Sequence, residues 1–271
     1  MERSGILNIF FDIDGTLLPV GKPVPADAVC ALNKVKSLGH RLFFCTGRSP
    51  VELTDELLGL PFDGGVFSAG ANIRLGDRTI SRKSMTEDQK NLFFRVVEKY
   101  DLLWLIQSDE GTFITPQAFS LYSGLTRKIH SRDIEFKGFI QVDDFPEDKP
   151  VYKMLILSEK GYVLEARKEL EGILHSVNNT TGLPQECAAE LMASGVSKAS
   201  GIEELVRYLG DDMGSTVGIG DGENDIEMID FCATGIAMGN ACDLLKKHAD
   251  YITADIEDGG IAKALDFVIR E

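Results

Sequence analysis

Residues 6–16 read Ile-Leu-Asn-Ile-Phe-Phe-Asp-Ile-Asp-Gly-Thr, an apolar run that stops at two closely spaced aspartates. The apolar part, residues 6–11, is typical of a buried β-strand. In open α/β sheets ligands bind beyond the carboxyl ends of the strands, so Asp12 and Asp14 are expected to project into such a site. A spacing of two along extended chain puts both carboxylates on one side. An aspartate-rich turn is the alternative reading of this motif alone.

Strand-like runs alternate with amphipathic helices in two parts of the chain. The first part predicts strands at 6–11, 41–45 and 66–67 with helices at 25–38 and 50–58. The second part, residues 198–269, has the same alternation. Apolar strands separated by helices predict an α/β fold with a doubly wound, mostly parallel, Rossmann-like sheet covered on both faces.

The middle of the chain has a different pattern, with runs of strands around two predicted helices, at about 87–100 and 162–175. This pattern predicts an α+β domain inserted into the α/β core. The expected organisation is therefore a discontinuous core made of residues 1–82 and 183–271, with the inserted domain at 83–182.

Composition excludes several classes of partner. The 271 residues include 43 acidic and 28 basic side chains, which gives a net charge of −15. Such a charge repels nucleic acid and anionic lipid, so neither is an expected partner. No apolar run approaches the roughly 18 residues of a membrane span, and the N-terminal run is too short for a signal-peptide core. Five cysteines without a CxxC pair indicate reduced thiols, which predicts a cytoplasmic location.

A second acidic loop, Gly-Asp-Gly-Glu-Asn-Asp at residues 220–225, follows the predicted strand 216–219 and opens a helix. Carboxylates from this loop and from Asp12 are the hard oxygen ligands that Mg²⁺ prefers, with positions left for water and a phosphate oxygen. The glycine-rich run could instead bind a dinucleotide. That reading is disfavoured because Asp221 and Glu223 would face the pyrophosphate with like charge.

Two further features occur near predicted strand or helix ends. Thr46, Gly47 and Arg48 follow the strand 41–45, where a hydroxyl and a free backbone N–H can bind a phosphoryl oxygen. Lys198 begins a predicted helix, where its charge opposes the helix dipole unless it interacts elsewhere. Each feature alone is weak evidence, since Thr-Gly turns and solvated lysines are common.

Taken together, in this order and at this spacing, the four motifs resemble those of the haloacid dehalogenase superfamily, most closely its Cof-type sugar-phosphatase branch (type IIB). The runs 237–241, 249–253 and 258–261 are also similar to that branch. The resemblance covers residues 6–75 and 186–269, and the middle segment has the size of the cap that this branch inserts. One departure is Ala69, where the branch usually has asparagine, so a contact from that position is in doubt.

The resemblance implies a two-step phosphoryl transfer. Asp12 would attack phosphorus and carry an aspartyl-phosphate, and Asp14 would protonate the leaving alcohol and then activate water. Thr46 and Lys198 would hold the charged phosphoryl oxygens.

The resemblance also implies a Mg²⁺ site, made by Asp12, the backbone carbonyl of Asp14 and Asp221. Asp225 is the fourth candidate at this site, and we expect it to support Lys198 or a metal-bound water more than to bind the metal directly. Further candidates for binding substrate are Gly47, Arg48 and Asn224.

These expectations describe a Mg²⁺-dependent phosphatase that hydrolyses a small phosphorylated metabolite, a sugar phosphate in the first instance, as a monomer or small homo-oligomer. The segment 83–182 would be the cap that sets specificity. Two alternatives stay open: a sugar phosphomutase of the same superfamily, and a noncatalytic sensor phosphorylated on aspartate. Asp14 argues against the sensor, which needs no acid or base beside its phosphorylated residue.

Overall fold

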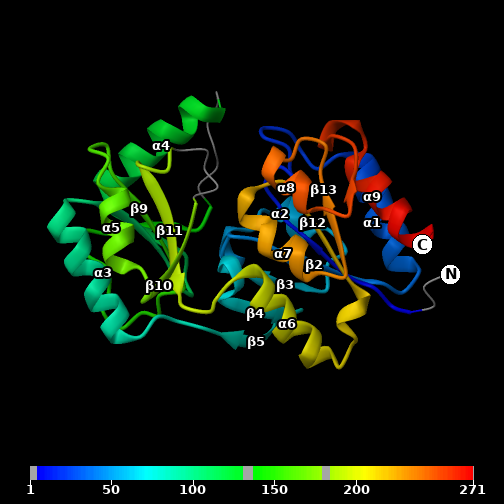
Figure 1. Ribbon diagram of the computed structural model, residues 1–271, viewed down its shortest axis with the longest axis horizontal. Helices are drawn as coiled ribbons and strands as arrows, with labels where there is room; N and C mark the ends of the chain where they lie inside the picture. The colour runs from blue at the N-terminus through cyan, green and yellow to red at the C-terminus, as the bar shows by residue number, and fades with distance from the viewer. Residues whose placement is uncertain (1–4, 131–136, 179–183, 271) are drawn as a thin grey trace.

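The computed structural model describes residues 5–130, 137–178 and 184–270, and places their strands in two β-sheets (Figure 1). The larger sheet has the strand order β14-β13-β12-β1-β2-β3-β4-β5. Neighbours from β14 to β3 pair in parallel, whereas β3, β4 and β5 pair antiparallel at one edge. The predicted doubly wound, mostly parallel sheet is therefore confirmed. Its strands are β1 (Asn8–Phe11), β2 (Arg41–Cys45), β3 (Gly64–Phe67), β4 (Asn72–Leu75), β5 (Arg78–Arg82), β12 (Thr216–Gly220), β13 (Thr234–Ala237) and β14 (Tyr251–Ile252).

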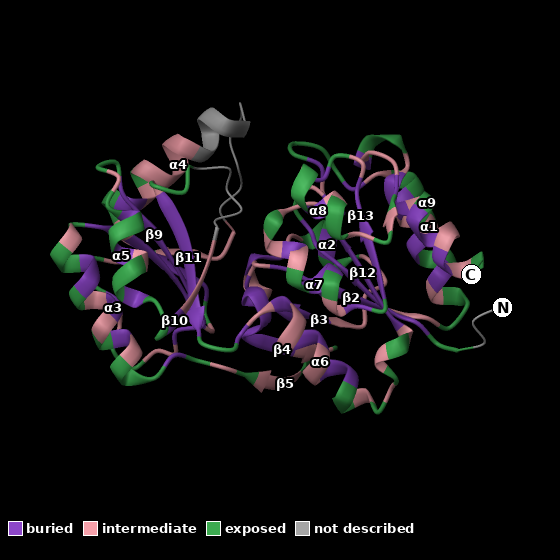
Figure 2. Cartoon of the chain, viewed as in Figure 1, coloured by how far each residue is buried: buried purple, intermediate pink, exposed green. Residues whose placement is uncertain are grey.

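Helices cover both faces of the larger sheet. In Figure 1, α1 and α9 lie together on one side and α6 and α7 on the other. Every residue of the central strands β1 and β12 is buried, as two covered faces require (Figure 2). Ser197 caps the N-terminus of α6, and Gly210 ends that helix in the left-handed region. The helices are α1 (Ala26–Ser37), α2 (Asp55–Leu58), α6 (Lys198–Leu209), α7 (Ile226–Phe231), α8 (Asp243–His248) and α9 (Gly260–Arg270).

The smaller sheet has the order β10-β11-β9-β6-β7-β8 and is antiparallel except for the β7–β8 pair. Helices α3 and α5 pack on one face, and α4 packs on the other. We call this sheet and its three named helices the insert. Its elements are α3 (Glu87–Tyr100), β6 (Leu103–Gln107), β7 (Thr112–Ile114), α4 (Pro116–His130), β8 (Phe139–Gln141), β9 (Lys153–Leu157), α5 (Val163–Leu170), β10 (Leu174–Asn178) and β11 (Ala188–Ala193).

The structure corrects two local predictions. The helix expected at 50–58 is a short 3₁₀ turn, Pro50–Glu52, followed by α2, because Thr54 is extended and caps the second piece. The helix expected at 162–175 ends at Leu170, and the chain turns at Gly172, whose φ of +79° is left-handed, before entering β10.

The chain enters the insert after β5 and leaves it after β11. The predicted domain boundary between residues 182 and 183 lies outside the described residues. However, β11 pairs with β9 and β10 in the smaller sheet, so residues 188–193 are part of the insert and not of the larger sheet. We therefore propose that the insert spans residues 84–194.

No helix within the described ranges has both the length and the apolar character needed to cross a bilayer.

Candidate active site

The predicted site residues gather at the carboxyl ends of β1, β2 and β12. The backbone N–H of Asp12 donates to the carbonyl of Ile219, at 2.9 Å, which ties the end of β1 to β12. The chain then turns through Gly15, whose φ is +85°. A Cβ at this glycine would lie 2.2 Å from Oδ2 of Asp221, so glycine is required both by the turn and by this close approach. Thr16 Oγ1 donates to Asp221 Oδ1 at 2.9 Å.

Lys198, the first residue of α6, reaches the carboxylate of Asp12. Its Nζ lies 2.6 Å from Asp12 Oδ1 and 2.5 Å from Asp225 Oδ1, and its side chain is only 2% exposed. Burial alone would lower the pKa of Lys198, but Asp12 and Asp225 raise it above its usual value. The lysine therefore stays protonated between two carboxylates.

Three carboxylates form one buried acidic cluster. Single oxygens of Asp12, Asp221 and Asp225 all lie within 4.8 Å of one another. Burial, then the charge of Asp225, raises the pKa of Asp12 well above its usual value, and the same causes raise the pKa of Asp221 to about 7. Carboxylates crowded together out of water are poised to be neutralised by a cation.

The partners of Asp225 distinguish it from the other two acids. One oxygen pairs with Lys198, and the other accepts hydrogen bonds from the backbone N–H groups of Asp221 and Gly222, each at 3.0 Å. With both oxygens already bonded, Asp225 is placed to orient Lys198 and the acidic loop. The donor set of Asp12 and Asp221, both hard carboxylates, fits a hard divalent cation such as Mg²⁺.

Asp14 lies outside the acidic cluster. Its side chain is 59% exposed and pairs with Arg48, so it does not point into the cluster with Asp12. The Nε of Arg48 lies 2.9 Å from one Asp14 oxygen, and Nη2 lies 2.5 Å from the other. Arg48 thus meets another predicted site residue rather than solvent.

The loop after β2 is held by the neighbouring loop after β3. The buried Thr46 accepts a hydrogen bond on its hydroxyl from the backbone N–H of Arg48, at 3.1 Å. The N–H groups of Ser68 and Ala69 donate to the carbonyls of Arg48 and Thr46. Ser68 and Ala69 both have positive φ, of 49° and 54°. Asparagine adopts this conformation more readily than alanine. Ala69, which stands where the resembled motif has asparagine, therefore lies at a strained position.

Asn224 lies in the 3₁₀ turn Glu223–Asp225 and is half-buried. Among the residues that the structure describes, no hydrogen bond joins it to the other predicted site residues.

Several buried polar residues of the insert face this site, and the sequence analysis missed them. Gln107 Nε2 donates to the carbonyl of Gly47 and to Glu52 Oε2, each at 3.1 Å, and the Thr112 hydroxyl donates to the other Glu52 oxygen. Lys153 and Glu190, from β9 and β11, form a buried ion pair at 3.1 Å. A charged residue inside an otherwise apolar strand is the signal that could have identified this pair.

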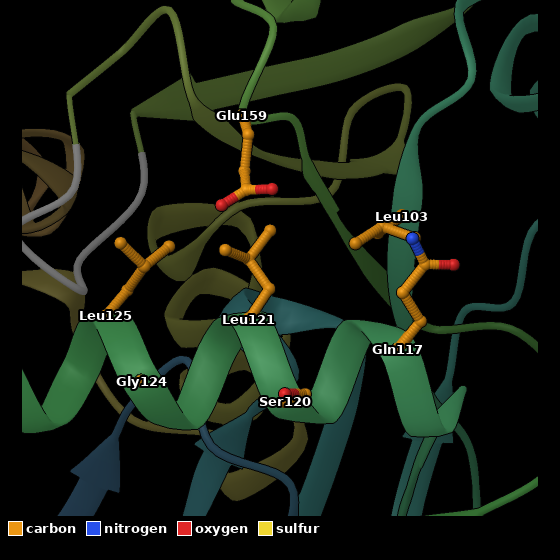
Figure 3. A pocket seen from close by; sticks show the side chains of 7 residues that line it. All are labelled: Leu103, Gln117, Ser120, Leu121, Gly124, Leu125 and Glu159. Atoms are coloured by element: carbon orange, nitrogen blue, oxygen red, sulfur yellow. The ribbon is translucent and has the colours of Figure 1, made fainter.

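A separate pocket lies within the insert, between α4 and the segment at Glu159 (Figure 3). In Figure 3 the side chains of Leu121 and Leu125 rise from α4 toward Glu159. None of the predicted site residues lines it. Its lining is Leu103, Gln117, Ser120, Leu121, Gly124, Leu125 and Glu159.

Comparison with known proteins gives one consistent family. Residues 9–265 match the model of the haloacid dehalogenase-like hydrolase family. The chain is 46% identical over 271 residues to the 5-amino-6-(5-phospho-D-ribitylamino)uracil phosphatase YcsE of Bacillus subtilis, covering 97% of this chain and 96% of that one. The similarly named YitU of the same organism is 25% identical, with 98% of each chain covered. A solved HAD subclass IIB sugar phosphatase superposes with a TM-score of 0.81 at 26% identity, covering 97% of this chain and 99% of that chain.

Proposed function

The chain belongs to the haloacid dehalogenase-like hydrolases and is a phosphatase, and we propose that it hydrolyses the phosphomonoester of a small sugar or sugar alcohol through an aspartyl-phosphate on Asp12, with Mg²⁺ as cofactor. The observation that carries this proposal is the position of Asp12. Its carboxylate lies at the end of a central parallel strand, beside the buried cation of Lys198 and the carboxylate of Asp221. A nucleophile, a phosphate-binding cation and a candidate metal ligand thus meet at one point.

In the first step an Asp12 oxygen attacks phosphorus, and the bond from phosphorus to the ester oxygen breaks. Asp14 donates a proton to that leaving oxygen. Lys198, the Thr46 hydroxyl and the Gly47 N–H hold the non-bridging oxygens while charge redistributes on them. Mg²⁺ bound by Asp12, the Asp14 carbonyl and Asp221 would supply charge neutralisation between the nucleophile and the phosphate dianion.

In the second step water attacks phosphorus of the aspartyl-phosphate. Asp14 accepts a proton from that water, the bond between phosphorus and the Asp12 oxygen breaks, and inorganic phosphate leaves. Asp225 keeps Lys198 in place throughout by its ion pair with the ammonium group. Both steps use the same residues, and the enzyme returns to its starting state.

The relatives suggest a particular substrate. YcsE and YitU are both named for 5-amino-6-(5-phospho-D-ribitylamino)uracil, which carries its phosphate on a chain of hydroxyl-bearing carbons. We propose that this chain accepts a phosphate ester of that kind. We also propose that the insert is the cap that selects it, because Gln107 and the Lys153–Glu190 pair lie against the loop that holds the phosphate. The five free thiols support a reducing, cytoplasmic location.

The test is release of inorganic phosphate from a panel of phosphorylated sugars, sugar alcohols and their nitrogenous derivatives, measured with Mg²⁺ and with the variant Asp12→Asn as control. We expect steady turnover of at least one polyol phosphate by the wild-type protein and none by the variant. Isomerisation stimulated by a sugar bisphosphate, without net phosphate release, would instead identify a phosphomutase. Absence of turnover with every ester would contradict the proposal.

A further inference from the structure

One face of the smaller sheet has an apolar part and a polar part. Side chains alternate along its strands, so Leu105 and Gln107 share a face, as do Lys153 and Leu155. The leucines pack under α4 in a separate apolar cluster. The polar residues lie beyond that cluster, at the strand ends next to the loop after β2. Beyond the cluster under α4, this face therefore carries polar side chains, next to Met192, which lies opposite Lys153.

Four buried polar side chains make up this region, one from each of four neighbouring strands. We call it the polar row. In order across β7, β6, β9 and β11 it consists of Thr112, Gln107, Lys153 and Glu190.

Within the polar row, Thr112 and Gln107 form hydrogen bonds with the loop that follows β2 of the larger sheet. Both donate to Glu52, and Gln107 also donates to the carbonyl of Gly47. These bonds position the insert against the loop after β2, which we propose holds the phosphate. Lys153 and Glu190 instead pair with each other across 3.1 Å, with side chains only 10% and 6% exposed.

The Lys153–Glu190 pair lies directly over Gly47. A methyl group added at Gly47 would lie 3.1 Å from Lys153 Nζ and 3.9 Å from Glu190 Oε2. The φ of Gly47 is not positive, so the backbone conformation does not require glycine here. What glycine provides is room for this charged pair next to the residues proposed to hold the phosphate.

We propose that Lys153 and Glu190 recognise the leaving group of the substrate and select a neutral group rich in hydroxyls over an anionic one. The inference rests on the proposed phosphatase function of the same site. A phosphate held at Thr46, Gly47 and Lys198 must direct its ester oxygen away from Asp12, and the side chains of the insert that lie next to Gly47 are Lys153, Glu190 and Gln107. An ammonium and a carboxylate together donate to and accept from hydroxyl groups, as a polyol requires.

The local charge disfavours a second anionic group. Among the residues that the structure describes, the two cations beside Gly47 both have an acidic partner, since Arg48 pairs with Asp14 and Lys153 with Glu190. Glu52 adds a further carboxylate beside Gln107. A substrate carrying a carboxylate or a second phosphate would meet this acidic surface with no unpaired cation in the pair to receive it.

The test compares three esters: ribitol 5-phosphate as the polyol, 3-phosphoglycerate as the anionic ester, and p-nitrophenyl phosphate as an ester without leaving-group hydroxyls. Lys153→Met should lower kcat/KM for ribitol 5-phosphate by about 30-fold, the cost of a lost hydrogen bond to a charged group, and should lower it much less for p-nitrophenyl phosphate. Glu190→Gln leaves Lys153 without its partner and should raise the ratio of 3-phosphoglycerate to ribitol 5-phosphate activity by about tenfold.

Two further variants separate recognition from folding. The double variant Lys153→Met/Glu190→Gln removes both charges of the pair together, so neither of these two charges is left buried without the other and the variant should fold. It should lose the preference for ribitol 5-phosphate. Lys160→Met, which removes an exposed lysine paired with Asp101 elsewhere in the insert, is the matched control and should change no ratio.

An equal change for all three esters in the double variant, or its failure to fold, would show a structural role and overturn the inference. An unchanged anionic-to-polyol ratio in Glu190→Gln would do the same. If the wild-type protein hydrolysed none of the esters, the proposed phosphatase function itself would be contradicted. That outcome is distinguishable from a failure of the inference about Lys153 and Glu190, which is judged from the ratios between esters.

Discussion

The guanidinium of Arg48 donates to both carboxylate oxygens of Asp14, at 2.9 and 2.5 Å, across 34 residues of sequence. This bidentate ion pair fixes the orientation of the carboxylate that we propose as general acid and base. It also joins the loop after β1 to the loop after β2, so the proposed proton-transfer group is oriented by the loop that we propose binds the phosphate. Arg48 is therefore a positioning residue in this account.

The first prediction concerns Arg48. Arg48→Met should lower kcat/KM for a sugar phosphate, which reports only the ester-cleaving first step, by about tenfold, because Asp14 loses the fixed geometry that proton transfer to the leaving oxygen needs. The loss should be smaller for p-nitrophenyl phosphate, whose leaving group needs little protonation. Steady-state kinetics on both esters measures the difference. Equal losses on the two esters would show that Arg48 does not act through Asp14.

The second prediction concerns Lys198. Lys198→Met should abolish turnover and destabilise the protein by about 3 kcal/mol near neutral pH, since it leaves Asp12 and Asp225 buried without their cation. Protonation relieves an unpaired carboxylate, so the deficit relative to wild type should shrink as the pH falls toward 5. Thermal unfolding at several pH values measures this. A deficit that stays constant with pH would contradict the assigned ion pairs.

The third prediction concerns the acidic cluster. In the folded protein the pKa of Asp221 is raised to about 7 from an ordinary value of 3.8. A raised pKa means that this group stabilises the fold when protonated, and that contribution is lost as the pH rises through about 7. Without divalent cations, the melting temperature should therefore fall between pH 5 and pH 8. Mg²⁺ should restore it at pH 8, where Asp221 is ionised.

The matched variant for this experiment is Asp221→Asn. It should show a weaker fall in melting temperature with pH and little response to Mg²⁺. A wild-type melting temperature that ignores Mg²⁺ at pH 8 would count against a metal site at Asp12 and Asp221.

The fourth prediction concerns the insert. Joining Lys83 to Gly195 through a short Gly/Ser linker removes the whole smaller sheet, including β11, and keeps all four motifs. The remaining core should hydrolyse p-nitrophenyl phosphate at a reduced rate, while its rates on different sugar phosphates converge. Retention of the full wild-type ratio between a good and a poor sugar phosphate would place specificity in the core loops.

Local patterns predicted most of the core from sequence alone. Strand β2 has the predicted bounds and helix α6 begins at Lys198 as predicted, because short apolar runs and helix-capping residues specify them locally. The candidate site motifs were found in the same way, since each follows directly on a predicted strand or begins a predicted helix.

The insert was harder to predict for physical reasons. Residues 188–193 read Ala-Ala-Glu-Leu-Met-Ala, a composition that favours helix, and become a strand by pairing with β9 and β10. Helix α4 was missed, although Thr115 and Pro116 form a helix-start signal and the Thr115 hydroxyl accepts from the N–H of Ala118. The contacts between insert and core form only when the two sheets pack against each other, so local sequence patterns do not reveal them. Their one signal in the sequence is the presence of charged residues inside the apolar strands β9 and β11.

The fifth prediction tests the central claim, that Asp12 becomes phosphorylated during turnover. Asp14→Asn keeps the nucleophile but cannot activate water, so the phosphoenzyme should accumulate when acetyl phosphate, which needs no acid for its leaving group, is the donor. Rapid acid quench followed by peptide mass spectrometry should find one phosphoryl group, on Asp12, and none in the double variant Asp12→Asn/Asp14→Asn. A phosphoryl group on any other residue, or none with several activated donors, would contradict the account.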